Sequence, residues 1–215
     1  MKKLLLIITF LSLNIFVFGQ KDNPKIFSEF VVSLNRTDLK DQNTENGNGF
    51  GIGIFKSFLD NKKVNIILGL EFNRTSQIKK SMYGGQFAHS TDVTYNFNWF
   101  SIPVTTRINF GEKIKFFIEP GIFVDIPIST REKGTLHSYI PNEENQIEYT
   151  ETEYDKKASQ IGLNYGLSFG LGMIIPISKV KLIIKPDYRL GLKTIYDYHD
   201  QIFNKYFRIN IGIKI

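Results

Sequence analysis

The sequence predicts an all-β protein, an eight-stranded antiparallel up-and-down transmembrane β-barrel. The first observation is a strict alternation of polar and apolar residues, clearest in the final segment "RINIGIKI", Arg208 to Ile215. Alternation at period two gives a strand one polar and one apolar face. The second is that short and long links alternate between such segments. The third is that no apolar run of about 18 residues, enough for a transmembrane helix, follows residue 20.

Eight segments carry this alternation, each near the roughly 9 to 11 residues that a tilted transmembrane strand needs. In "GFGIGIFKSF", for example, Phe50, Ile52 and Ile54 alternate with glycines. An even number of strands returns both chain ends to the same side of a membrane. The final segment must pair with the first, so that no strand edge is left open in lipid. The expected strands are residues 26–36, 49–58, 64–77, 97–110, 115–130, 159–175, 181–193 and 204–215.

The links between these segments differ sharply in length. The second and third segments are joined by "LDNKK", the fourth and fifth by "GEK", and the sixth and seventh by "SK". Outer-membrane barrels have tight periplasmic turns and longer extracellular loops. The long links are hydrophilic, so we expect mobile loops there, either alone or with strand extensions beyond the membrane. These long links are residues 37–48, 78–96, 131–158 and 194–203.

The polar faces of the segments carry acids and bases in near balance. Buried charges persist when they are paired and hydrogen-bonded, so this balance suits a closed lumen. The alternative is a soluble lipocalin-like barrel with its apolar face inside. Its outer face would carry many Lys and Glu, whereas segments 49–58 and 159–175 have mainly Gly, Ser and Asn. The predicted lumen charge network is Glu29, Glu71, Arg107, Glu119, Asp125, Lys185, Asp187, Arg189 and Arg208.

Aromatic residues lie near several strand ends. Such residues form girdles at the two membrane interfaces of outer-membrane barrels. The predicted girdle residues are Phe58, Tyr95, Phe97, Trp99, Phe110, Tyr196, Tyr198 and Tyr206.

The N-terminal stretch "MKKLLLIITFLSLNIFVFGQ" has the layout of a secretory signal peptide. We expect residues 1–19 to be removed by cleavage before Gln20, or alternatively before Lys21, which leaves a single barrel domain at 20–215. The alternative is an anchor helix, but its roughly 15 apolar residues, interrupted by Asn14, fall short of the ~20 that a span needs. The chain has no cysteine, which excludes a lipidated N-terminus and disulfides. The net charge of +6 is mild and requires no nucleic acid.

Two stretches resemble a known family. "FSIPVTTRINFGEKIKFFIEPGIFVDIPIS" resembles the central hairpin of the Bacteroidetes-type outer-membrane β-barrel proteins of the PorT-like group, and "QIGLNYGLSFGLGMIIP" is similar to their strand with a small-residue lumen face. The resemblance covers essentially the whole mature chain. It implies an eight-stranded barrel in a Gram-negative outer membrane and brings no catalytic residues. The chain ends on Ile215, not on the Phe frequent in such barrels, so insertion would depend on the alternating apolar residues from Phe207 to Ile215.

The sequence offers little catalytic chemistry. His89, His137 and His199 fall in expected loops, far apart in sequence, without cysteine or His-x-His spacing, so we expect no metal and no cofactor. The dipeptides His89-Ser90 and His137-Ser138 form no Ser-His pair, because adjacent strand residues point to opposite faces. No G-x-S-x-G motif occurs. The glycines in "GFGIG" and "GLSFGLG" follow period two and precede no expected helix, so they face the lumen and bind no phosphate.

These observations favour a non-enzymatic outer-membrane protein with a structural, adhesion or assembly and secretion role carried by its extracellular loops. The expected partners are outer-membrane lipid, the insertion machinery and envelope or secretion-system proteins. One alternative is a lipid-modifying enzyme that uses a loop histidine with a serine and an acid. Another is a small-solute channel, although the side chains of an eight-stranded barrel fill its own interior.

Overall fold

The structure is a computed structural model in which residues 26–37, 44–59, 62–85, 87–141, 146–158, 162–178, 180–194 and 203–215 are described. These residues form ten strands. A helix with the length and apolar character needed to cross a bilayer is absent from these ranges. The expected signal peptide, with both of its cleavage sites, lies outside them, as do His199, Tyr196 and Tyr198.

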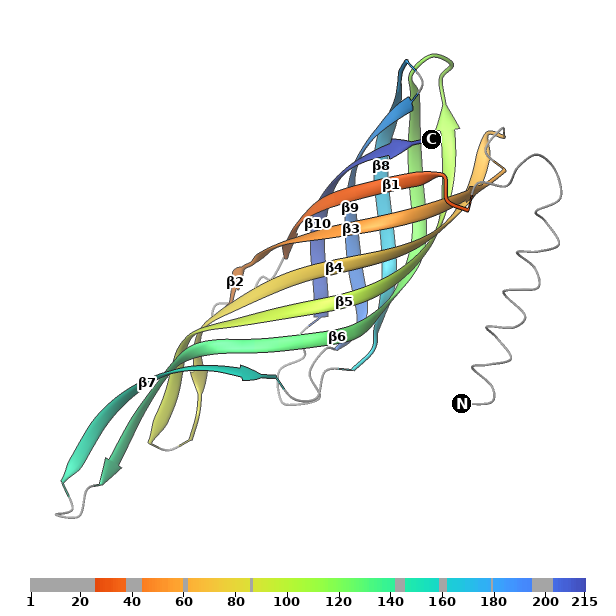
Figure 1. Cartoon of the computed structure of the whole chain (residues 1–215). Helices are drawn as coiled ribbons and strands as arrows, with labels where there is room; N and C mark the ends of the chain where they lie inside the picture. Colours follow the sequence, from red (N-terminus) through yellow and green to blue (C-terminus); the bar gives the residue numbers. More distant parts are fainter. Residues whose placement is uncertain are drawn as a thin grey trace, which may run out of the picture.

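Eight strands close into a ring through antiparallel pairing (Figure 1). The strand β4 pairs with β5, and β1 pairs with β10 from Glu29↔Lys214 to Thr37↔Tyr206. The eight-stranded antiparallel barrel is therefore confirmed, including the pairing of the final strand with the first. In ring order the strands are β1 (Glu29–Thr37), β3 (Asn48–Phe58), β4 (Val64–Tyr83), β5 (Ala88–Phe110), β6 (Lys115–Pro141), β8 (Asn164–Ile177), β9 (Val180–Thr194) and β10 (Phe203–Lys214).

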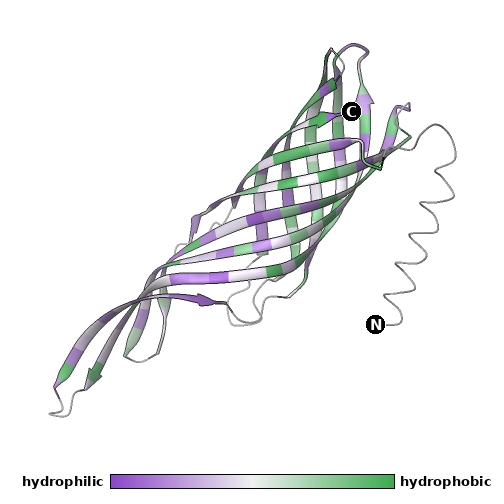
Figure 2. Cartoon of the chain, in the orientation of Figure 1, coloured by the Kyte–Doolittle hydropathy of each residue, from purple (hydrophilic) through white to green (hydrophobic). Residues whose placement is uncertain are grey.

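The wall of the barrel is apolar outside and polar inside. On β10, Ile211 is 52% exposed, whereas Arg208 is 2% exposed. Figure 2 shows the same alternation of hydrophobic and hydrophilic residues along the strands. The lipocalin-like arrangement, with the apolar face inward, is thereby excluded.

Glycines on the inner face make room for large side chains of neighbouring strands. A Cβ at Gly69 would lie 2.4 Å from the ring of Phe55, and one at Gly172 would lie 2.4 Å from the ring of Phe117. Any larger residue at these positions would displace an aromatic ring from the lumen. This is the packing that the glycine-rich segments predict for a narrow interior.

Three strands run well past the barrel at one end (Figure 1). Their outer parts, residues 78–83 of β4, 88–96 of β5 and 131–141 of β6, form with β7 (Ile147–Lys157) what we call the protruding sheet. A short strand, β2 (Thr44–Asn46), also pairs with β4. The long links 78–96 and 131–158 are thus largely strand extensions. Pairing between these strands gives their backbone N–H and C=O groups hydrogen-bond partners.

A register shift marks the junction between the barrel and the protruding sheet. Asn98 faces Ser129 and Trp99 faces Pro127, so β6 has one extra residue there. After such a bulge, the other set of alternate residues of the strand faces inward. On β6, Asp125 is buried before the bulge, and Thr130 and Glu132 are buried after it.

Candidate functional site

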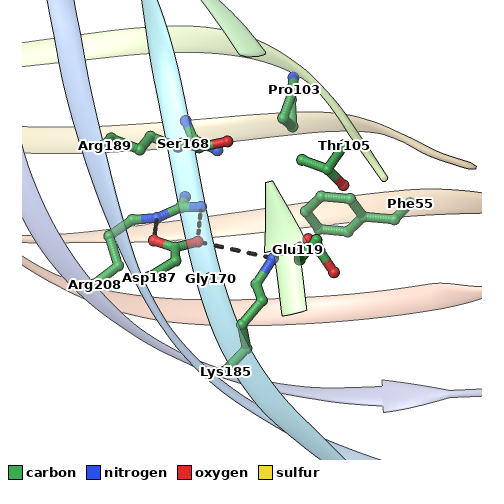
Figure 3. Close-up of a pocket in the computed structure, with 10 residues that line it drawn as sticks. All are labelled: Phe55, Pro103, Thr105, Glu119, Ser168, Gly170, Lys185, Asp187, Arg189 and Arg208. Carbon is green, nitrogen blue, oxygen red and sulfur yellow. Dashed lines mark hydrogen bonds and ion pairs between the residues drawn. The ribbon is translucent and has the colours of Figure 1, made fainter. Parts of the chain in front are cut away.

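The structure brings all nine predicted lumen residues together inside the barrel. Each lies on the inner face of its strand because it shares the parity of that face, and each is at most 6% exposed. Figure 3 shows part of the network. The nine residues are Glu29, Glu71, Arg107, Glu119, Asp125, Lys185, Asp187, Arg189 and Arg208.

The first part of the network is centred on Arg107 of β5. Its two terminal nitrogens donate to the two carboxylate oxygens of Glu29, at 2.7 and 3.0 Å. Its Nε donates to Oε2 of Glu119 at 2.6 Å. Lys214 Nζ lies 3.3 Å from Glu29 Oε1. Bidentate contacts between Arg and a carboxylate fix both side chains in position, so Arg107 connects β1 and β6 to β5.

The second part is centred on Arg208 of β10. Its Nε and Nη2 bind the two oxygens of Asp187 at 2.7 and 2.6 Å, and its Nη1 lies 3.1 Å from Glu71 Oε1. Arg189 of β9 pairs with Glu71 and lies 3.8 Å from Asp125. These contacts join β4, β6, β9 and β10 across the lumen.

Lys185 connects the two parts. Its Nζ lies 2.7 Å from Glu119 Oε1 and 3.7 Å from Asp187 Oδ2 (Figure 3). A continuous series of ion pairs therefore runs through the lumen. The network predicted from the sequence does not include Lys214, although this residue shares the alternation of Arg208 and Asn210. With Lys214 included, the described network has five acids and five bases: Glu29, Glu71, Glu119, Asp125 and Asp187, with Arg107, Lys185, Arg189, Arg208 and Lys214.

Very little space remains beside these charges. A cavity bounded by Phe55, Thr105 and Lys185, among other residues, has room for about one water molecule (Figure 3). Because these charged side chains are buried inside the barrel, they form a polar core in this part of the lumen.

Aromatic side chains fill the lumen toward the protruding sheet. Tyr95, Phe97 and Trp99 are buried there, and successive rings stack with centroids 6.2 and 5.7 Å apart. The prediction that these residues and Tyr206 form an interfacial girdle is wrong. Tyr95, Phe97 and Trp99 have the same parity as Arg107 on β5. Tyr206 has the same parity as Arg208 on β10, so all four side chains face inward. Of the other predicted girdle residues, Phe58 is half-buried and Phe110 is 44% exposed.

A second cluster lies in the protruding sheet. His89 and His137 are direct cross-strand partners, with ring centroids 4.8 Å apart. His137 Nε2 lies 2.8 Å from Thr91 Oγ1, and its Nδ1 lies 2.6 Å from the Tyr149 hydroxyl. The expectation that His89 and His137 lie in loops is therefore wrong, because they lie in β5 and β6. Only the register between the two strands brings them together, and the sequence contains no direct signal of it.

The contacts of this cluster bear on the enzyme alternative. A lipid-modifying triad needs a histidine between a serine and a carboxylate. His137 instead contacts a threonine and a tyrosine, and Ser138 Oγ lies 2.6 Å from Thr150 Oγ1. In the ranges covered by the structure, no three or more His, Asp or Glu residues are grouped so as to hold a metal.

Ion pairs connect the strands at the base of the protruding sheet. Asp155 of β7 lies 2.8 Å from Lys133 Nζ and 3.0 Å from Arg131 Nε, both on β6. The hydrogen bond from Lys133, with the charge of Arg131, lowers the pKa of Asp155 below its usual value of 3.8. These side chains are exposed, so the pairs orient β7 on β6 more than they stabilise it.

No family model matches the chain, and neither does any curated protein sequence. Several solved structures have a similar strand arrangement. Neisserial surface protein A is 9% identical, over 87% of this chain and 95% of its own, with a TM-score of 0.46. Ail of Yersinia pestis is 11% identical, over 88% and 100%, with a TM-score of 0.38. A major outer membrane protein of Thermus thermophilus is 10% identical, over 86% and 97%, with a TM-score of 0.44. Similarity at this level assigns no activity.

Proposed function

We propose that the protein is a non-enzymatic integral outer-membrane β-barrel whose protruding sheet contacts partners outside the cell. The observation that carries this proposal is the apolar outer face around a charge-paired lumen. Lipid offers no hydrogen bonds, so a spanning chain must satisfy its backbone internally, and a closed ring of strands does so. In water, the same exterior would expose an apolar surface around the whole barrel.

The two ends of the barrel support an orientation. The short links after β3, β5 and β8 lie at the end that also holds the C-terminus, and the protruding sheet lies at the other end (Figure 1). Short turns face the periplasm in outer-membrane barrels. In this orientation the protruding sheet extends from the cell surface.

A structural, adhesion or secretion-associated role fits this geometry. The filled lumen leaves the exposed surfaces as the places where partners can bind. Outer-membrane lipid would contact the apolar wall, and the insertion machinery would recognise the apolar face of β10, from Phe207 to Ile213. Membership of the PorT-like group, with its link to secretion-system proteins, is the finer form of the proposal and rests on the resemblance of residues 100–129 and 160–176.

The orientation can be tested by labelling introduced cysteines, because the chain has none of its own. Tyr139→Cys places a thiol in the protruding sheet, and Lys113→Cys places one in the short link after β5. A membrane-impermeant maleimide added to intact cells should label only the former, and after lysis it should label both. Equal labelling on intact cells, or recovery of the protein with soluble periplasmic contents, would contradict the proposal.

The small-solute channel makes an opposite prediction. Charged and aromatic side chains fill the lumen, so the purified barrel should give no conductance steps in planar bilayers. Regular steps from the unmodified protein would favour the channel over the non-conducting barrel.

A further inference from the structure

One edge of the protruding sheet is open. The strand β7 pairs with β6 along Ile147–Lys157, and no other described strand pairs with it. An exposed edge strand presents a row of unpaired backbone N–H and C=O groups that can accept another strand. The edge is long enough, at 11 residues, to hold an extended peptide in a defined register.

The side chains along this edge have a regular pattern. Tyr149, Glu151 and Glu153 alternate along the strand and therefore lie on one face. All three are exposed. On the adjacent strand β6, His137 faces Glu151 and Thr135 faces Glu153, so neither Lys nor Arg lies directly across from either carboxylate. Glu151 accepts one long contact, 3.4 Å, from the Tyr149 hydroxyl.

The outer part of the protruding sheet is acidic, unlike the rest of the molecule. The described residues of 81–92 and 134–153 include four acids and no Lys or Arg, in a chain whose net charge is +6. At the base of the sheet, by contrast, Asp155 is paired with Lys133 and Arg131. These four acids are Asp92, Glu148, Glu151 and Glu153.

We propose that the open edge of β7 binds an extended basic segment of another protein by strand addition, with Lys or Arg at alternate positions facing Glu151 and Glu153. The backbone edge supplies the hydrogen bonds, and the alternating carboxylates select the side chains. The ring of Tyr149, next along the same face, offers a surface for a third basic or aromatic side chain. This inference deepens the proposed function and depends on its exposure of the protruding sheet at the cell surface.

Other occupants fit less well. If a second copy paired its own β7 about Thr152, Glu151 would face Glu153, and like charges directly opposite one another destabilise a strand pair. An anionic lipid surface would be repelled by the same acids. A basic strand alone matches both the open backbone and the charge.

The test uses the full chain in lipid nanodiscs and a nine-residue peptide that alternates lysine with threonine. The peptide should bind measurably by calorimetry at low salt, more weakly at high salt, and should protect amides of 147–157 from hydrogen exchange. Glu151→Gln with Glu153→Gln should weaken binding by up to about fivefold for each carboxylate. Glu112→Gln, at the opposite end of the barrel, is the matched control and should leave binding unchanged.

Two further peptides separate the contributions. A peptide with glutamate in place of lysine tests the charge, and a lysine peptide with a central proline tests strand addition, because proline cannot continue the hydrogen-bond ladder. Both should bind poorly. Equal binding of the glutamate peptide, or undiminished binding to the double variant, would overturn the inference. Dimers that form without peptide through the β7 edge would assign that edge to a second copy instead.

Failure of this inference is distinguishable from failure of the proposed function. If Tyr139→Cys is labelled on intact cells and the lysine peptide does not bind, the barrel and its orientation stand and only the basic partner is rejected. If Tyr139→Cys is labelled only after lysis, the surface location itself is rejected.

Discussion

Three strands, β4, β5 and β6, run through both the barrel wall and the protruding sheet, yet different forces stabilise the two regions. In the wall, Arg107 and Glu29 form an ion pair whose side chains are 2% and 1% exposed. In the protruding sheet, Arg131 and Asp155 form one whose side chains are 61% and 34% exposed. The backbone ladder continues through both regions. The comparison teaches that burial stabilises the wall, whereas β7 at the edge of the protruding sheet depends mainly on backbone pairing with β6.

The largest effect should come from breaking the buried network. Arg107→Met leaves the Glu29 and Glu119 carboxylates without their shared partner in the lumen. Removing one member of a buried pair costs about 3–5 kcal/mol. Urea unfolding in lipid vesicles should show this loss in the free energy of unfolding. The matched change in the protruding sheet, Arg131→Met, should have no measurable effect on barrel unfolding, and similar losses for both variants would remove the distinction between the two regions.

A charge on the outer wall should have the next largest effect. Ile211 is 52% exposed on β10, and, under the proposed function, Ile211→Arg would place a guanidinium against lipid. The cost is about 2–4 kcal/mol if the position lies near the bilayer midplane. Ile147→Arg, at a residue 70% exposed in the protruding sheet, is the control and should fold as well as the parent. Folding yield into vesicles, read from the heat-dependent gel shift, measures both, and equal yields would argue that the wall does not face lipid.

Overfilling the lumen should have a smaller effect. Gly69→Ala would place a methyl group 2.4 Å from the Phe55 ring and 2.9 Å from Pro103. Overpacking of this kind costs about 1–3 kcal/mol. Adding Phe55→Leu should restore part of the stability, measured by the same urea unfolding. If the smaller side chain gives no recovery, the ring of Phe55 is not what excludes a side chain at Gly69.

The smallest effect concerns pH and should be confined to the protruding sheet. The pKa of Asp155 is lowered by Lys133 and Arg131, so the folded sheet binds a proton less readily than the unfolded chain does. The contribution of the Asp155 ion pairs to the stability of the folded sheet is therefore complete at pH values above the usual pKa of 3.8. It is lost as the pH falls through the lowered pKa. Hydrogen exchange should show β7 losing protection at acid pH in the parent but not in Asp155→Asn, which is already neutral. Equal acid sensitivity in the two proteins would assign the effect to another group.

Much of the barrel could be predicted because each wall residue obeys a single local rule. Parity alone places Glu71, Arg107 and Arg208 inside, and the structure brings them together. The same rule predicts that Trp99 and Lys214 face inward. The girdle prediction for Trp99 is wrong because aromatic residues near strand ends are typical of the membrane interface, whereas the parity of Trp99 places it in the lumen.

The protruding sheet could not be predicted in the same way. The strand β7 is mainly polar on both faces, as the exposure of Glu151 and Thr152 shows, so no period-two hydrophobic signal marks it. Its strands form because each provides hydrogen-bonding partners for the next, and that information lies in the register between segments far apart in the chain. The stacking of His89 on His137 follows from that register alone.

The continuity of β5 and β6 also has a mechanical consequence. The strands have 23 and 27 residues and run from the short link between them, through the wall, into the protruding sheet. At about 3.3 Å per residue, each is roughly 75–90 Å long when extended. A force applied along the strand direction at the outer end of the protruding sheet would load the backbone hydrogen bonds of β5 and β6 in shear. Many hydrogen bonds would then share the force, and none would open alone. A force applied to the protruding sheet would therefore pass into the barrel wall through the same two strands, β5 and β6.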